Sequence, residues 1–203
     1  MAMAPLSPKA RDLIYQFEGV DQPSDWPGGA SGITIGYGYD LGQDADDFQT
    51  DWAQYLAAAD LELLNGVLGL QGAAAQAKAA SLKSIRIKQS DSQAVFLNRS
   101  VPKYQAQTEG AFPGIDALPA DAQGALLSLV YNRGTSMTGD SRSEMRAIRD
   151  AVPSGNLQEI ANQLRAMKRL WVGKGLDGLL KRRDAEADLV ESCIPPQAPA
   201  VEA

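Results

Sequence analysis

Apolar residues along this chain recur mostly at the spacing of helices. In the N-terminal segment, four of them fall on one helical face: Ala10, Leu13, Ile14 and Phe17. Ser7 followed by Pro8 is a typical N-cap and first helical position, and Gly19 is a typical stop. The pattern therefore predicts a helix that begins at Ser7-Pro8 and ends directly after Glu18.

The following segment has a different pattern. Residues 20–32 contain two prolines and three glycines, which predict turns. Residues 33–41 (ITIGYGYDL) predict a short bent strand or hairpin, which Gly36 and Gly38 weaken. Helical spacing then returns and predicts helices over 47–70, 73–87, 91–106, 119–134, 141–152, 156–169 and 177–191. A small β element followed by a helical body predicts an α+β protein of two lobes.

Composition fits a globular protein. The 203 residues allow one domain with a sizeable core, and 44% hydrophobic and 22% charged residues are ordinary values. No segment approaches the ~20 apolar residues of a membrane helix, and the N-terminus has no apolar run of signal-peptide length. We therefore expect a protein made in the cytoplasm without a signal peptide and without membrane insertion. We expect the proline-rich residues 193–203 to form a disordered tail.

The net charge of −6 is unevenly distributed. Residues 1–70 carry eleven acidic and two basic side chains, whereas residues 71–203 have a net charge of +3. The acidic total argues against nucleic acid as a partner. The split leaves two interpretations open: the basic second part faces an anionic substrate, or the two parts have differently charged solvated surfaces.

The chain has no histidine and one cysteine, Cys193. This excludes an intrachain disulfide, a Ser-His-Asp triad, a Cys-His pair and histidine zinc sites. The acidic run Asp44, Asp46 and Asp47 lacks the spacing and glycine of a calcium loop. We therefore expect neither metal nor cofactor, and any acid–base chemistry must use Asp, Glu, Tyr or Lys.

Glu18 is well placed for such chemistry. Its apolar neighbours Phe17 and Val20 can desolvate the carboxyl and raise its pKa, as a general acid in glycoside hydrolysis requires. Thr34 offers a hydroxyl with few rotamers that can hold a water molecule. The glycines beside it allow a polymer to approach the backbone closely.

Three segments resemble one family. Glu18-Gly19 followed by residues 34–38 (TIGYG) resembles the corresponding motif of phage-type lysozymes of glycoside hydrolase family 24. Residues 125–134 (ALLSLVYNRG) are similar to the core helix of that family, and residues 178–187 (GLLKRRDAEA) to its closing segment. The longer stretch WPGGASGITIGYGYDLG resembles a branch found in phage endolysins and bacterial toxin or effector muramidases.

The resemblance implies one catalytic domain over 1–192, with a β-lobe at about 19–45, a helical lobe at about 47–192 and a cleft between them. It implies cleavage of the β-1,4 bond between N-acetylmuramic acid and N-acetylglucosamine in peptidoglycan. Glu18 would be the general acid and Thr34 the residue that positions water. We expect a monomer whose partner is the peptidoglycan glycan strand.

The second carboxylate departs from the family pattern. Family members usually have an aspartate six residues before the threonine, where this chain has Gly28. Asp25 is the nearest loop acid on that side and is our candidate, with Asp40 as the alternative. Asp40 can equally cap the next turn or stabilise the hairpin. Asp21 follows Glu18 so closely in sequence that we do not expect it to be the partner.

Four further residues are candidates for substrate binding: Trp26, Tyr37, Tyr39 and Arg133. Trp26 could stack on a sugar ring or fill the β-lobe core. The two tyrosines could line the cleft or pack beneath it. Arg133 could contact a muramyl carboxylate or bind helix-end carbonyls.

Near the C-terminus, Lys181, Arg182 and Arg183 predict a solvated basic helix face. Either arginine can pair with Glu186 at helical spacing.

The main hypothesis is thus a wall-lysing muramidase, either an endolysin or an antibacterial effector. It would act in the periplasm or cell wall after release through holin pores or delivery by a secretion system. An effector would imply a cognate immunity protein. The alternatives are a hydrolase of a chitin-like polymer and, because of Gly28, an inactive wall-binding module with a lysozyme fold.

Overall fold

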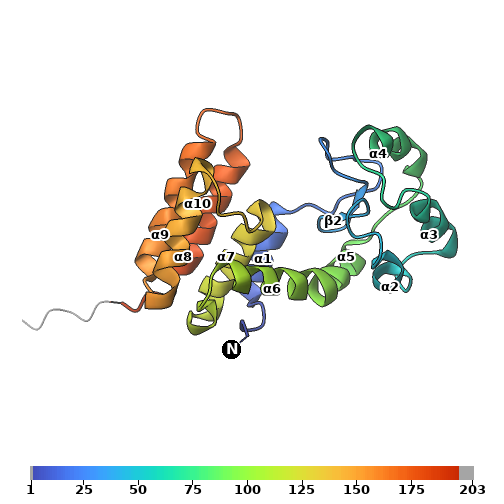
Figure 1. Ribbon diagram of the computed structural model, residues 1–203. Helices are drawn as coiled ribbons and strands as arrows, with labels where there is room; N and C mark the ends of the chain where they lie inside the picture. The colour runs from blue at the N-terminus through green and yellow to red at the C-terminus, as the bar shows by residue number, and fades with distance from the viewer. Residues whose placement is uncertain (1, 197–203) are drawn as a thin grey trace, which may run out of the picture. The chain divides into compact units, whose positions relative to one another are not determined.

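The structure, a computed structural model, describes residues 2–196. The chain forms two compact units whose elements are labelled in Figure 1. The hairpin unit is Glu18–Pro102, and the helical unit consists of the described parts of Met1–Phe17 and Lys103–Ala203. Of the predicted tail, residues 197–203 lie outside the described residues.

The hairpin unit contains a two-stranded antiparallel sheet. β1 (Thr34–Ile35) pairs with β2 (Tyr39–Asp40), and Thr34 lies opposite Asp40. The hairpin predicted over 33–41 is confirmed, although its paired strands are only two residues long. Because a lone hairpin is marginally stable in water, this one needs other elements to bury its apolar side chains.

The helices that follow the hairpin supply this apolar surface. They are α2 (Phe48–Trp52), α3 (Ala58–Asn65), α4 (Gly72–Ala79), the 3₁₀ turn η1 (Ala80–Leu82) and α5 (Gln89–Val95). Their buried side chains share one core with the hairpin: Ile33, Ile35, Leu41, Phe48, Trp52, Leu64, Ala75, Leu82 and Ile85. The hairpin and these helices therefore belong to one unit, whereas the sequence predicted a lobe boundary near residue 46.

Two predicted helices of this unit are broken in the structure. The helix predicted over 47–70 is divided by a turn at 53–57, which lets both α2 and Leu64 contact the hairpin core. The helix predicted over 73–87 ends at Ala79 and continues only as η1.

The helix predicted over 91–106 is longer in the structure. α5 continues through a π-helical turn, η2 (Phe96–Ser100), into α6 (Val101–Ala111). Pro102 has no backbone N–H to donate to the carbonyl four residues earlier, and the irregular turn ends two residues before it. α6 begins in the hairpin unit and ends in the helical unit.

The helical unit is a bundle. Its main helices are α1 (Pro8–Phe17), α6, α7 (Ala120–Arg133), α8 (Ser143–Ala151), α9 (Leu157–Ala166) and α10 (Asp177–Glu191). Short 3₁₀ turns join them: η3 (Ile115–Ala117), η4 (Asp140–Arg142), η5 (Val152–Ser154) and η6 (Met167–Leu170). α7 packs against α1 and α10, while α9 packs between α8 and α10, which lie side by side with it in Figure 1.

α1 has a capped N-terminus and, near its start, a close contact with α7. The Ser7 hydroxyl accepts a hydrogen bond from the Ala10 N–H at 3.2 Å, which confirms the predicted N-cap. Gly124 of α7 lies so near α1 that a Cβ added there would come within 2.2 Å of the Ala10 Cβ. Only glycine therefore permits this distance between α1 and α7.

The arginines of α10 correct the sequence-based expectation. Arg182 and Arg183 are 2% and 0% exposed, so the prediction of a solvated face is wrong for both. They are buried because α10 packs against α1, α7 and α9. The predicted pairing with Glu186 is confirmed: its Oε1 lies 2.7 Å from the Arg183 Nη2 and 3.3 Å from the Arg182 Nε.

Ser128 of α7 completes this group by donating a hydrogen bond to Glu186 Oε1 at 2.7 Å. The Arg182 guanidinium carbon lies 5.9 Å from the ring centroid of Phe17, within the range of a cation–π contact. We call Ser128, Arg182, Arg183 and Glu186 the buried ion cluster. Through Phe17 it contacts the end of α1, directly before Glu18.

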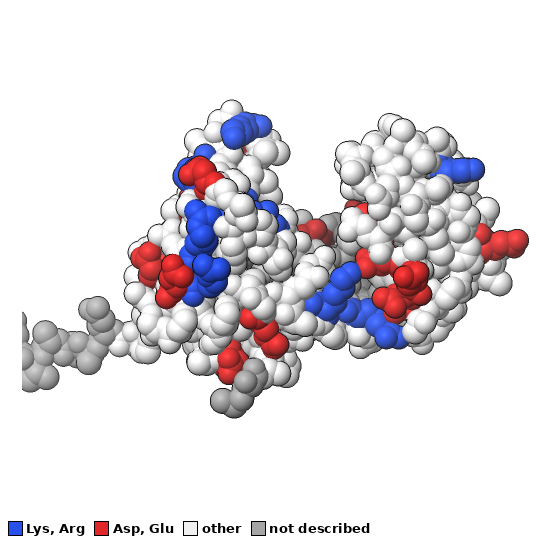
Figure 2. Space-filling view, viewed as in Figure 1, with Lys and Arg blue, Asp and Glu red and all other residues white. Residues whose placement is uncertain are grey.

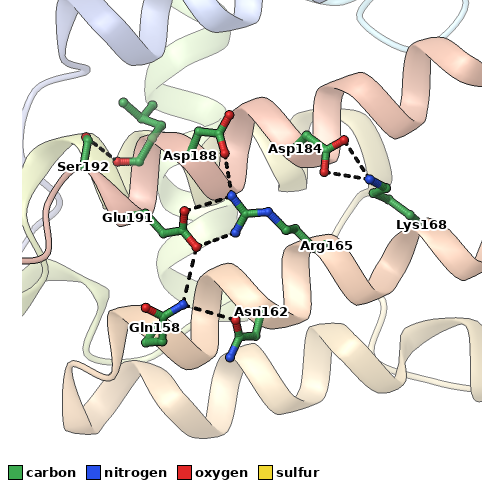
Figure 3. A network of polar contacts seen from close by, with 9 residues as sticks. Gln158, Asn162, Arg165, Lys168, Asp184, Asp188, Glu191 and Ser192 are labelled. Atoms are coloured by element: carbon green, nitrogen blue, oxygen red, sulfur yellow. Dashed lines mark hydrogen bonds and ion pairs between the residues drawn. The ribbon is translucent and has the colours of Figure 1, made fainter.

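A second polar network joins α9 and η6 to α10 at the surface (Figure 3). Arg165 forms ion pairs with Asp188 and Glu191, and its Nη2 lies 2.9 Å from Glu191 Oε2. Lys168 Nζ lies 2.7 and 2.8 Å from the two Asp184 oxygens. The hydrogen bonds from Arg165 lower the pKa of Glu191.

We expect Arg165→Met to lower the free energy of unfolding by about 1 kcal/mol or less at neutral pH, because such pairs are partly exposed. A carboxyl whose pKa is lower in the folded protein stabilises the fold at pH values above its ordinary pKa. This stabilisation is lost as pH falls through the pKa of the folded state. The difference from wild type should therefore shrink in acid and in high salt, as measured by urea unfolding. Lys181→Met, on the exposed face of α10, is the control and should show no such dependence.

Charges of both signs lie on the surface that Figure 2 draws. On the face drawn in Figure 2, basic and acidic side chains are interspersed on each unit. This arrangement agrees with the interpretation of solvated charged surfaces.

Candidate active site

Glu18 is the first residue of the hairpin unit and follows α1 directly. Its side chain is half-buried. Three residues later the chain meets the hairpin, because Asp21 forms an isolated antiparallel bridge with Gly36. The Asp21 N–H donates to the Gly36 carbonyl at 2.7 Å, and the Gly36 N–H donates to the Asp21 carbonyl at 3.0 Å. The segment that carries Glu18 is thus bonded to the TIGYG stretch.

The glycines of TIGYG have a structural role in this arrangement. Gly36 and Gly38 have φ angles of +60° and +69°, which other residues rarely adopt. A Cβ on Gly36 would also lie 3.0 Å from the Trp52 ring. These glycines let the turn reverse tightly against the core while Gly36 pairs with Asp21.

Thr34 lies on β1 and is 7% exposed. Its backbone pairs with Asp40, so the hairpin holds it in a fixed position. Its role in positioning water stays a prediction.

Asp21 is the acid that sequence reasoning set aside. Its carboxylate accepts a hydrogen bond from the Gly38 N–H, so it is attached to the hairpin by its side chain as well as its backbone. Burial and then the charge of Glu18 raise the pKa of Asp21 to about 6, against the effect of the Gly38 N–H, and Asp25 adds to the rise. Proximity in sequence to Glu18 therefore does not keep Asp21 away from the site.

Asp25, our sequence candidate, is exposed. Its N–H donates to the Gln22 carbonyl at 2.9 Å, and its carboxylate accepts from the Ser24 hydroxyl at 3.4 Å. Asp25 lies near enough to Asp21 for its charge to act there.

The carboxylate of Asp40, the alternative candidate, accepts hydrogen bonds from residues on both sides of the hairpin. Its Oδ1 accepts from the Gly42 N–H at 2.8 Å and from the Gly32 N–H at 3.0 Å. Its Oδ2 accepts from the Gln43 side chain at 3.1 Å. These contacts agree with the alternative in which Asp40 stabilises the hairpin.

We expect Asp40→Ala to lower the free energy of unfolding by about 1–3 kcal/mol, because it leaves backbone N–H groups without their acceptor. Asp25→Ala, at an exposed position of the same unit, should change it by about 0.5 kcal/mol or less. Urea unfolding followed by circular dichroism gives both values. Equal midpoints for the two variants would show that Asp40 does not stabilise the hairpin.

The aromatic candidates Trp26 and Tyr37 contact other residues of the hairpin unit. The Trp26 Nε1–H donates to the Ser31 carbonyl at 3.0 Å, and the ring packs against the core of the hairpin unit. Tyr37 is buried and meets Phe96 edge to face, with 5.8 Å between ring centroids. Both rings therefore pack within the hairpin unit, as one of the two sequence-based alternatives expected.

Tyr39 is also buried. Its hydroxyl donates to Asp51 Oδ2 at 3.0 Å, and its ring meets that of Trp52 edge to face at 5.7 Å. Burial and the Asp51 carboxylate raise the pKa of Tyr39 above its ordinary value, so it stays neutral at physiological pH.

Arg133 lies in the helical unit at the end of α7. Its Nη2 donates to the Ser141 carbonyl at 2.8 Å, and its guanidinium carbon lies 4.8 Å from the Trp171 ring centroid. Burial, followed by the charges of Arg142 and Arg183, lowers the pKa of Arg133 to about 10, so it remains cationic at neutral pH. It therefore joins α7 to η4, and its contact with substrate stays a prediction.

Among residues 2–196 there is no group of three or more Cys, Asp or Glu side chains placed to hold a metal ion. Within the same part of the chain, no helix combines the length and apolar character needed to cross a membrane.

Comparison with protein families decides the relationship. The model of the phage lysozyme family matches residues 15–186. The chain belongs to the phage lysozyme family. The match begins before Glu18 and ends at Glu186, so it includes the hairpin, α7 and the buried ion cluster. The α+β fold expected from the sequence, with a small sheet and a mostly helical remainder, is confirmed.

No curated protein sequence matches this phage lysozyme family member. The family points to a glycoside hydrolase that degrades peptidoglycan.

Proposed function

We propose that the protein is a muramidase that hydrolyses the β-1,4 bond between N-acetylmuramic acid and N-acetylglucosamine. The observation that carries this proposal is the bridge between Asp21 and Gly36, which connects the segment bearing Glu18 to the hairpin bearing Thr34. The family match supports peptidoglycan as the substrate class.

In this mechanism the Glu18 carboxyl donates its proton to the glycosidic oxygen as the bond to C1 of the muramic acid breaks. A water molecule adds to C1 and gives a proton to a second carboxylate. The rigid position of Thr34 on β1 suits a hydroxyl that orients this water. Asp25 or Asp40 as the second carboxylate stays a prediction.

Identification of the products tests this proposal. Purified peptidoglycan is digested, the new sugar ends are reduced with borohydride, and the muropeptides are analysed by mass spectrometry. We expect reduced muramic acid ends. Reduced glucosamine ends would indicate a glucosaminidase, and anhydromuramic ends would indicate a lytic transglycosylase; either would overturn the proposal. Chitin oligosaccharides, the other substrate considered, should remain intact.

Gly28 at the usual position of the family aspartate favours a second candidate, an inactive wall-binding module. Such a module would sediment with peptidoglycan and release no muropeptides. The same digestion, followed by centrifugation, separates the two functions.

We further propose that the protein acts in the periplasm or cell wall, as an endolysin released through holin pores or as an effector delivered by a secretion system. An effector would be accompanied by an immunity protein. Expression of the protein in the periplasm and, separately, in the cytoplasm of a bacterial host tests the site of action. We expect lysis only from the periplasmic form.

A further inference from the structure

We infer that the Asp21 carboxylate, held on the hairpin beside Glu18, is the base that accepts the proton of the attacking water. This inference rests on the proposed muramidase function and names a residue outside the position that the family uses. It also replaces Asp25 and Asp40 as the partner of Glu18.

Backbone bonds fix the position of Asp21. Its N–H and carbonyl both bond to Gly36, at 2.7 and 3.0 Å, and its carboxylate accepts from the Gly38 N–H. Both hairpin partners are backbone groups of glycines with positive φ, so the geometry depends on the turn and not on a mobile side chain. A base needs such a fixed position relative to the water that it activates.

The carboxyl of Asp21 also interacts with that of Glu18. The two groups are close enough for the charge of one to disfavour ionisation of the other. Such a pair tends to hold one proton between its two members, which gives one acid and one base at the same pH. Glycoside hydrolysis needs this division of roles.

Glu18 and Asp21 together supply and accept the protons of this step. Glu18 gives its proton to the leaving glycosidic oxygen while the C1–O bond breaks, and water forms the new C1–O bond and gives a proton to Asp21. Glu18 is then an anion and Asp21 is neutral. Transfer of that proton to Glu18, directly or through water, restores the starting state.

The other acids differ from Asp21 in their surroundings. Asp25 is exposed and bonds to its neighbour Ser24. Asp40 uses both oxygens to bind Gly32, Gly42 and Gln43 within the hairpin. Asp21 is the half-buried acid of this group whose charge is coupled to that of Glu18.

The charged groups that act on Asp21 are Glu18 and Asp25 from its own segment, and the hairpin contributes the Gly38 N–H. Burial and Glu18 raise the pKa of Asp21 to about 6, so above that pH the pair loses the proton that it shares. We expect kcat/KM of the wild type to fall as pH increases through this value, because the pair then has no proton left to give to the leaving oxygen.

Asp21→Asn is the decisive variant, because asparagine keeps the backbone bridge and nearly the same volume. Initial rates of muropeptide release are measured across the range in which carboxyl groups titrate, with thermal unfolding as the check on folding. We expect kcat to fall about 10²–10⁴-fold with KM little changed, and the decline in rate with rising pH near 6 to disappear. Asp46→Asn, at an exposed position of the same unit, is the control and should keep both the rate and the pH profile.

Asp21→Glu serves if Asp21→Asn unfolds. This variant keeps a carboxyl at a shifted position, and we expect a lower rate with the alkaline limb of the pH profile retained but displaced. A purely structural role predicts no displacement of that limb. Retention of the wild-type rate and pH profile by either folded variant would overturn the inference, as would loss of kcat in Asp25→Asn instead.

The same assay separates this inference from the proposed function. If the wild type releases reducing muramic acid ends and Glu18→Gln does not, the muramidase function holds whatever Asp21→Asn does. If the wild type releases no such ends, the proposed function fails, and the role of Asp21 fails with it.

Discussion

Replacing Glu18 with glutamine is expected to lower the rate of peptidoglycan hydrolysis about 10²–10⁴-fold while leaving the fold intact. Glutamine has nearly the same shape as glutamic acid, but its amide does not donate a proton to a leaving oxygen at neutral pH. Glu18 lies outside the regular turns of α1 and is half-buried, so the substitution should change the unfolding temperature little.

Glu62→Gln is the matched control, because Glu62 is an exposed glutamate of the same unit, on α3. It removes one negative charge, as Glu18→Gln does, and should keep full activity. Loss of turbidity of a purified wall suspension measures the rates of both variants. Solubilisation of the wall by Glu18→Gln as fast as by the wild type would show that Glu18 is not the general acid.

Glu186→Gln is expected to lower the free energy of unfolding by about 3–5 kcal/mol. The Glu186 carboxylate is fully buried and compensates two buried guanidinium groups, those of Arg182 and Arg183. An amide in its place leaves both cations in the interior without a counter-charge. The Glu186 Oε1 also accepts the Ser128 hydroxyl, so the bond between α10 and α7 weakens.

Glu191→Gln on the same helix is the control, because its pairing with Arg165 is partly exposed and should contribute about 1 kcal/mol or less. Urea unfolding of the two variants gives the comparison. Combining Glu186→Gln with Arg183→Met removes one of the uncompensated cations, and the double variant should be more stable than additive costs predict. Equal midpoints for Glu186→Gln and Glu191→Gln would contradict the role of the buried ion cluster.

Local patterns predicted the parts of the fold that depend on local chemistry. Ser7 and Pro8 define the start of α1, because capping needs only neighbouring residues. The glycine-interrupted residues 33–41 form the predicted hairpin, since strand and turn chemistry are encoded within that stretch. The motif that resembles phage lysozymes lies within the region that the family model matches.

The contacts that the sequence did not predict join residues distant along the chain. The bridge from Asp21 to Gly36 spans a loop of turns whose path no periodicity defines. Arg182 and Arg183 have the spacing of a solvated charged face, and only the packing of α10 against α7 shows that they are buried. Sequence spacing did indicate their pairing with Glu186, because both lie within one helical turn of it.

The position of the second carboxylate also depends on contacts that the sequence did not predict. Proximity to Glu18 in sequence argued against Asp21, whereas the structure attaches Asp21 to the hairpin through three backbone groups. Asp40 follows the TIGYG stretch, but its oxygens bind Gly32 and Gly42, on the two sides of the hairpin. Neither arrangement can be derived from residue type and spacing alone.

The most direct test of the central claim is digestion of purified peptidoglycan in ¹⁸O-labelled water by the wild type and by Glu18→Gln. Immediate borohydride reduction prevents exchange of the new sugar ends, and mass spectrometry locates the label. We predict that the wild type places one solvent oxygen on C1 of a new muramic acid end and that Glu18→Gln forms almost none of this product. Unlabelled anhydro ends, labelled glucosamine ends, or equal product from both proteins would contradict a muramidase that uses Glu18 as its general acid.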